Sequence, residues 1–163
     1  MICDQRILGK IFNSLYLVGM LLGSFIFGMI SDQFGRLKAV ILSIFVTAVS
    51  GALGAVVFNP VAFAILRITC GMGGIGCYMV SYVIAAETTL PSYKIITTTL
   101  VGIGFIFGEL VLALEAYLIR DWVTLQLVAY LPMLILLGLY FILPESTRWL
   151  IARGETEHCR KVA

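Results

Sequence analysis

Charged side chains are scarce in this chain, and their scarcity excludes most classes of soluble protein. Only 12% of the 163 residues are Asp, Glu, Lys or Arg, whereas about a quarter are charged in a typical soluble domain. The few basic residues form no stripe or cluster, so nucleic acid is not expected as a partner. The composition therefore indicates an integral membrane protein.

Side chains that carry catalysis or bind metals are also sparse. The chain has one histidine, His158, in a polar stretch near its C-terminal end. No Ser/His/Asp set, phosphate-binding loop or cluster of metal ligands can be drawn from the sequence. We therefore expect neither an enzyme nor a bound metal or cofactor.

The four cysteines do not form a disulfide framework. Cys70 and Cys77 lie seven residues apart in one apolar run, which places them about 10 Å apart along a helix. That separation is too large for a disulfide, and no C-x-x-C motif is present. We interpret both as small packing residues, with redox or metal chemistry as the open alternative.

Apolar sequence is abundant, at 61% of the chain. Five uncharged or nearly uncharged segments are long enough to cross about 30 Å of hydrocarbon. Backbone polar groups must be paired inside lipid, so each segment is predicted to be a helix. The predicted fold class is an all-α membrane protein with five transmembrane helices, at about residues 11–30, 39–58, 61–86, 95–119 and 122–143.

Residues 28–38 form a short polar stretch between the first two spans, which predicts an antiparallel helix hairpin. Gly28 is expected to admit a neighbouring helix, and Gly35 a tight turn with positive φ. The pattern G-x-x-x-D-x-x-G-R-x-K resembles the cytosolic loop between helices two and three of the major facilitator superfamily. It departs from that pattern at Gln33, where a base is usual. A generic charged hairpin turn is the alternative.

The distribution of Lys and Arg predicts the orientation in the membrane. If the 28–38 loop is cytosolic, seven basic residues lie on that side and three on the other, with Arg67 inside a span. The N-terminus is then outside, and the polar stretch after the last span is inside.

Residues 144–150, P-E-S-T-R-W-L, resemble the motif that follows helix six in the organic cation, carnitine and organic anion transporter family. Residues 119–122 and 22–25 match the same family. The resemblance implies that residues 1–144 are part of the N-terminal half of a major facilitator fold, as helices two to six of twelve. Residues 145–163 would then begin a cytosolic loop. Thr147 stands where the family has a second proline.

The same resemblance implies the function. We expect an incomplete chain of a plasma-membrane transporter that moves small organic ions by alternating access. Its partners would be the organic ion, the lipid bilayer and the missing part of the transporter. A non-transporting membrane protein, or a truncated subunit that regulates a full-length partner, is the alternative.

Acids and bases recur at the predicted cytosolic helix ends, where ion pairs would lock the bundle closed and release it on rocking. Solvated loop charges are the alternative reading. The candidate gating charges are Asp32, Arg36, Glu87, Lys94, Glu145 and Arg148.

Arg67 begins a pattern, R-x-x-x-G-x-G, that resembles the helix-four signature of the same superfamily. An arginine at this depth faces protein or water, or extends to the outer surface. Small residues at helical spacing let helices approach closely in lipid. The predicted packing set comprises Arg67 with Gly19, Gly23, Gly28, Gly35, Gly71, Gly73, Gly104 and Gly108.

Several polar side chains inside the spans are candidates for a substrate cavity. Glu109 is expected near the middle of the membrane, where it would bind a cation, pair with Arg67 or carry a proton. Acids outnumber bases inside the spans, which favours a cation or a zwitterion such as carnitine. The full candidate set is Glu109, Glu115, Tyr78, Tyr82, Tyr16 and Asn13.

Overall fold

The computed structural model describes residues 2–135, 137 and 138, and these residues form helices and no strand. The order is α1 (Ile2–Phe34), α2 (Arg36–Val56), α3 (Pro60–Thr88), the short 3₁₀ helix η1 (Pro91–Tyr93), α4 (Lys94–Leu118) and α5 (Trp122–Ile135). Four of them, α1 to α4, have the length and apolar composition needed to cross a membrane. The described part of α5 is shorter, and the predicted end of its span at residue 143 lies outside the described residues. The predicted all-α membrane fold is confirmed.

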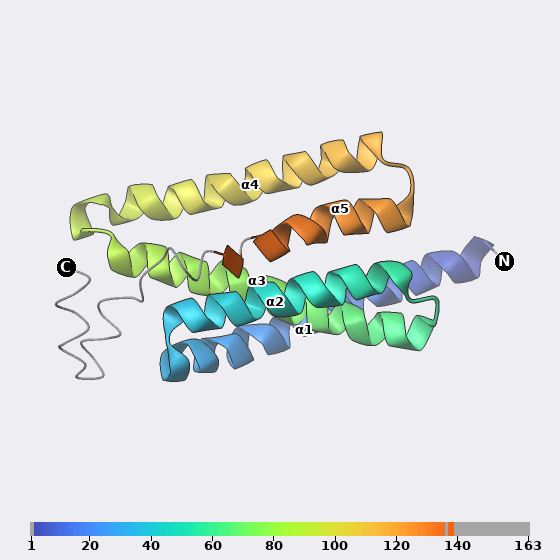
Figure 1. The fold of residues 1–163 in the computed structure, drawn as a ribbon, viewed down its shortest axis with the longest axis horizontal. Coiled ribbons are helices and arrows are strands. Elements are labelled where there is room, and N and C mark those ends of the chain that lie inside the picture. The colour runs from blue at the N-terminus through green and yellow to red at the C-terminus, as the bar shows by residue number, and fades with distance from the viewer. Residues whose placement is uncertain (1, 136, 139–163) are drawn as a thin grey trace.

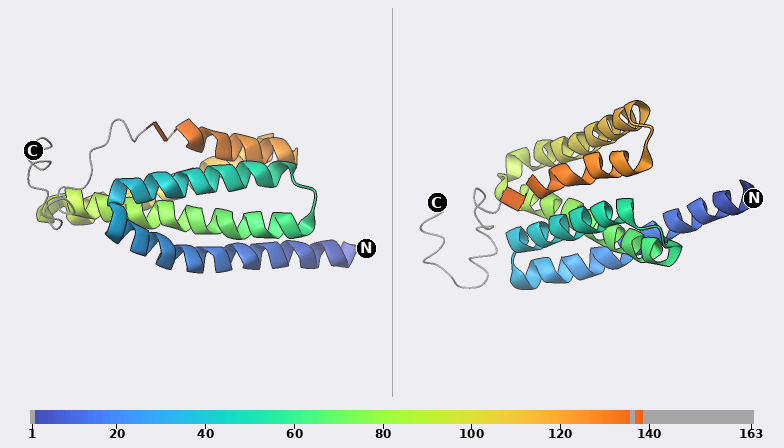
Figure 2. Two further views of the ribbon diagram at one scale, coloured as in Figure 1. Left: turned by 60° about the horizontal axis from the view of Figure 1, so that its bottom comes forward. Right: turned by 45° about the vertical axis from the view of Figure 1, so that its right-hand side comes forward.

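α1 and α3 extend beyond both ends of the apolar runs that predicted them. α1 has 33 residues, about 50 Å at the α-helical rise, and its N-terminal end extends past the other helices (Figures 1 and 2). The polar stretch 28–38 is also almost entirely helical, because only Gly35 separates α1 from α2. Gly35 has a φ of 112°, the positive value expected for a tight turn.

Local sequence sets the other helix starts. Asn59 accepts a hydrogen bond from the backbone N–H of Val61 at 3.0 Å, and Pro60 occupies the first turn of α3. Asp121 accepts hydrogen bonds from the backbone N–H and the hydroxyl of Thr124, at 3.0 and 2.6 Å, and so caps α5.

The helices are arranged around α3, which packs along both α1 and α2 (Figure 2). α5 lies on α2, whereas α4 runs alongside α5 and touches the rest of the bundle mainly near the end of α3 (Figure 1). α2 contributes the largest share of buried positions, and α4 contributes none. The core is therefore the α1–α2–α3 bundle, with the α4–α5 hairpin placed on one side.

Glycines bring α1 and α2 against α3. A Cβ on Gly19 or Gly23 of α1 would collide with the backbone of Ile68 or Met72, and one on Gly71 of α3 would collide with the backbone of Tyr16. Such contacts let helix backbones approach closely without a hydrophobic driving force. A Cβ on Gly73 would likewise collide with Thr47 of α2.

Three glycines do not have the close neighbours that were expected. A Cβ on Gly28, Gly104 or Gly108 would meet nothing within 4 Å among the described residues. Gly28 lies inside α1 and not in a turn. Gly104 and Gly108 lie on α4, which stands apart from the α1–α3 core. Glycine spacing predicts close helix packing only where the glycine face itself meets a second helix, and among the described residues these three faces do not.

Candidate functional site

One polar cluster joins the ends of α1, α2 and α3 around Arg36. Its guanidinium forms an ion pair with Asp32 of α1 and donates a hydrogen bond to the hydroxyl of Ser31 at 2.9 Å. The other terminal nitrogen lies 3.3 Å from Oε1 of Glu87 in α3. The Arg36 and Glu87 side chains are 18% and 20% exposed, whereas Asp32 is 70% exposed. The Arg36–Glu87 contact is therefore the partly desolvated part of the cluster.

The other predicted gating charges do not join this cluster within the described chain. Lys94 is the exposed first residue of α4 and makes no ion pair with a described residue. Glu145 and Arg148 lie outside the described residues.

A second polar centre lies inside the helices, at Arg67, about two turns from the start of α3. Its guanidinium carbon lies 5.9 Å from the ring centroid of Tyr16, 5.5 Å from that of Phe63 and 5.9 Å from that of Trp122. The three rings come from α1, α3 and α5. Each ring face attracts a cation by roughly 0.5–2 kcal/mol, depending on desolvation. Arg67 is therefore half-buried among aromatic rings.

Two cavities flank Arg67, and both are also lined by Trp122. One measures about 370 Å³ and opens between α1 and α3. The other measures about 270 Å³ and opens between α3, α4 and α5. The first is lined further by Gly9, Phe12, Asn13 and Phe63, and the second by Leu112, Ala116, Leu125, Gln126, Ala129 and Tyr130.

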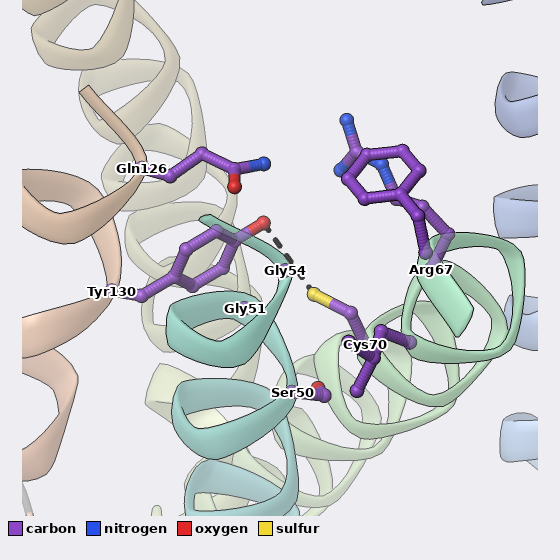
Figure 3. A pocket seen from close by; sticks show the side chains of 9 residues that line it. Ser50, Gly51, Gly54, Arg67, Cys70, Gln126 and Tyr130 are labelled. Carbon is purple, nitrogen blue, oxygen red and sulfur yellow. Dashed lines mark hydrogen bonds between the residues drawn. The ribbon is translucent and has the colours of Figure 1, made fainter. Parts of the chain in front are cut away.

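Polar side chains of α5 face Arg67 across a third and much smaller pocket of about 10 Å³ (Figure 3). The Cys70 thiol donates a hydrogen bond to the hydroxyl of Tyr130 at 3.4 Å. Gln126 is only 7% exposed, and its side-chain oxygen accepts no hydrogen bond from a described residue. A buried amide oxygen without a donor costs free energy, so this atom marks a place where a donor belongs.

The predicted cavity residues divide into two groups. Asn13 and Tyr16 join Arg67, the first as a wall of the 370 Å³ cavity and the second through its ring. Tyr78 and Tyr82 lie on a different stretch of α3 and are 37% and 39% exposed. Tyr78 packs edge-to-face on Phe105 of α4, with ring centroids 5.4 Å apart.

The two intramembrane acids do not meet Arg67. Glu109 is exposed on α4 and Glu115 is half-buried, and neither lines the cavities around Arg67. Glu109 forms no ion pair with Arg67 among the described residues, and its two other suggested roles, binding a cation and carrying a proton, stay predictions. Depth along a helix can be counted from sequence, but the direction in which a side chain points depends on how the helix packs.

Gln126 and Tyr130 were missed by the sequence reasoning. The usable signal was Gln126 itself, the one side-chain amide in the otherwise largely apolar segment Trp122–Ile135. A polar side chain in a membrane helix usually faces protein or a cavity. Tyr130 follows four residues later and so shares its face.

Comparison with known proteins identifies the family. Residues 4–163 match the family model described as "Sugar (and other) transporter". The chain belongs to this family of the major facilitator superfamily. It is thus a multi-pass membrane protein related to transporters and not to enzymes.

Several sequence relatives are named as organic cation or carnitine transporters. The chain is 36% identical to the "Organic cation transporter protein" of Drosophila melanogaster, over 96% of this chain and 29% of that protein. It is also 36% identical to the "Organic cation/carnitine transporter 2" of Homo sapiens, over 99% of this chain and 29% of that protein. The resemblance inferred from the motifs is confirmed. The chain spans less than a third of the length of these relatives.

Solved structures agree on the fold. The proton:xylose symporter XylE superposes with a TM-score of 0.89 at 22% identity, over 99% of this chain and 40% of that one. A partially occluded inward-open form of XylE from E. coli gives a TM-score of 0.77 at 25% identity, and the match covers 91% of this chain and 42% of that one. The five helices are therefore arranged as in part of a major facilitator transporter.

Proposed function

We propose that this chain is part of a plasma-membrane transporter that moves small organic ions by alternating access. The family and the relatives named as organic cation and carnitine transporters support the substrate class. Because the chain spans about 29% of those relatives, the transporting unit includes more than these helices.

The observation that carries the mechanism is the contact of Arg36 with Glu87. It ties the start of α2 to the end of α3 at the end of the bundle predicted to be cytosolic. The pair is only partly exposed, so it is screened less than a surface pair and stabilises the arrangement in which these ends meet. A rearrangement that separates these two helix ends has to break it.

The aromatic-lined cavities at Arg67 lie away from the Arg36–Glu87 contact, near the start of α3. In the proposed orientation, with the basic loops in the cytosol, the cavities lie toward the outer side. The arrangement fits a carrier whose inner ends are joined while a cavity is open outward. It supports a zwitterionic substrate better than a simple cation, because the charged side chain that lines the cavities is an arginine.

Transport is tested by reconstituting the complete gene product in proteoliposomes. We expect saturable uptake of a small organic cation or zwitterion and much weaker uptake of an organic anion. Wild-type protein that inserts correctly but takes up none of the three would contradict the proposal. That outcome would favour the alternative, a non-transporting membrane protein that regulates a partner.

A further inference from the structure

Ser31 is a polar side chain buried where α1 packs on α3. It is 2% exposed, and it ends a row of buried residues spaced four apart, Gly19, Gly23, Phe27 and Ser31. Residues at this spacing lie on one face of a helix. That face packs on α3, because the ring of Phe27 lies where a Cβ on Gly76 would be. The described helices alone bury Ser31, so its burial does not depend on the rest of the transporter.

The Arg36 guanidinium is the hydrogen-bond partner of this hydroxyl within the described residues. Its Nη1 donates to Oγ of Ser31 at 2.9 Å. The other serines of α1 and α2 instead donate to a backbone carbonyl of their own helix, as Ser24 does to Leu21 at 2.8 Å. A buried hydroxyl without a partner costs free energy, so the contact with Arg36 accounts for a polar residue at this position.

Three contacts orient the flat guanidinium, and they differ in exposure. Nη1 donates to both Ser31 and Asp32, Nη2 lies 3.3 Å from Oε1 of Glu87, and the buried Nε has no acceptor. Ser31 and Asp32 are consecutive, so they point about 100° apart around α1. Ser31 holds Nη1 from the packed side, whereas the 70% exposed Asp32 holds it from the solvent side. Because the guanidinium is a rigid fork, fixing Nη1 directs Nη2 toward Glu87.

We propose that Ser31 is a positioning residue, which holds the Arg36 guanidinium in the orientation that reaches Glu87. This inference rests on the proposed function and adds a residue to the contact between the ends of α2 and α3. Ser31 acts through Arg36. Without its hydroxyl, Nη1 keeps only the exposed carboxylate of Asp32, and the guanidinium can turn toward solvent. The Arg36–Glu87 contact is then formed for a smaller fraction of the time. Hydrogen bonds to charged groups are stronger than neutral ones, so the loss is measurable.

The test is a cycle of single and double variants of the complete gene product. The measurement is the labelling rate of a single cysteine at the predicted cytosolic end of α3. We expect S31A to change the rate at least about twofold, in the same direction as E87Q. S31A should add no further change to E87Q or to R36Q, because each already lacks the contact. S24A is the matched control on α1, since its hydroxyl bonds only its own helix, and it should label at the wild-type rate.

A wild-type rate in S31A would overturn the inference. So would an effect of S31A of the same size with Glu or Gln at position 87, or with Arg or Gln at position 36. In each of these cases Ser31 is only a small packing residue.

Thermal unfolding in detergent gives a second readout that needs no labelled cysteine. S31A should lower the Tm of the wild type but not that of R36Q, in which the buried hydroxyl has already lost its partner. An equal fall in both backgrounds would also overturn the inference. Absence of substrate uptake by the wild type would instead refute the proposed function, while the labelling and unfolding measurements still decide the role of Ser31.

Discussion

The Arg36 guanidinium on the first residue of α2 lies 3.3 Å from the carboxylate of Glu87, 51 residues away at the end of α3. Asp32 binds the same guanidinium from α1. Three helix ends therefore meet at one basic side chain. If these helix ends separate in one state of the carrier, the contact stabilises the other state and biases the equilibrium between them.

E87Q is expected to shift that equilibrium toward the state open to the cytosol. Losing a partly exposed ion pair costs about 1 kcal/mol, which is about a fivefold change in the ratio of the two states. The measurement is the labelling rate of a single cysteine placed at the predicted cytosolic end of α3, in the complete gene product. E87D, which keeps the carboxylate, is the matched control and should stay nearer to the wild-type rate than E87Q. An unchanged rate in E87Q would show that the pair does not contribute to gating.

G71A is expected to destabilise the bundle, because the new Cβ would collide with the backbone of Tyr16. Separating two packed helices to admit a methyl group costs roughly 1–3 kcal/mol. G104A is the matched control, since its Cβ would meet nothing within 4 Å among the described residues. It should be neutral or slightly stabilising, as alanine favours helix over glycine. The stability of both variants is measured by thermal unfolding in detergent. An equal loss of stability in G71A and G104A would contradict the packing described above.

Asp121 predicts a pH effect at the start of α5. Hydrogen bonds from the Thr124 hydroxyl and backbone N–H lower the pKa of this carboxyl. Because this pKa is lower in the folded state than in the unfolded state, ionised Asp121 stabilises the fold. That stabilisation is fully present above the ordinary pKa near 4 and is lost as the pH falls through the pKa of the folded state. D121N keeps a capping side chain, so it should retain stability at neutral pH and lose this pH dependence. The free energy of unfolding of the wild type and of D121N, measured between pH 3 and 7, tests the effect. The same dependence on pH in both proteins would contradict it.

Trp122 should report ligand binding at Arg67. Its ring centroid lies 5.9 Å from the guanidinium carbon, and it lines both cavities. A carboxylate that binds Arg67 changes the electric field at this ring. In the complete gene product with its other tryptophans replaced by phenylalanine, carnitine should therefore shift the emission while choline leaves it nearly unchanged. Identical responses to both compounds would argue against a carboxylate site beside this ring.

Much of the fold could be predicted from the sequence, for a physical reason. Uncharged runs of about 20 residues have few alternatives to a membrane helix, so the five segments were found. The end of the first segment was placed four residues too early, because polar residues such as Asp32 continue the helix and only Gly35 interrupts it. Hydropathy measures where lipid begins, whereas a helix ends where its hydrogen bonds stop.

The site was predicted less completely, because it depends on contacts between helices. The energetic cost of a charge in a membrane drew attention to Arg67, and the contact of Arg36 with Glu87 was among the expected ion pairs. The aromatic surroundings of Arg67 come from three helices and leave no local signal in the sequence. Glu109 was assigned to a substrate cavity by its depth alone; it is exposed on α4 and does not line the cavities beside Arg67, and its role in a substrate cavity stays a prediction.

Counterflow tests the central claim of alternating transport most directly. Proteoliposomes with the complete gene product are loaded with unlabelled carnitine and placed in a trace of labelled carnitine. A carrier that returns faster when loaded should show saturable uptake that is accelerated by internal substrate and slowed in R67Q. Uptake that rises linearly with concentration and ignores internal substrate, or no uptake above that of empty vesicles, would contradict the account.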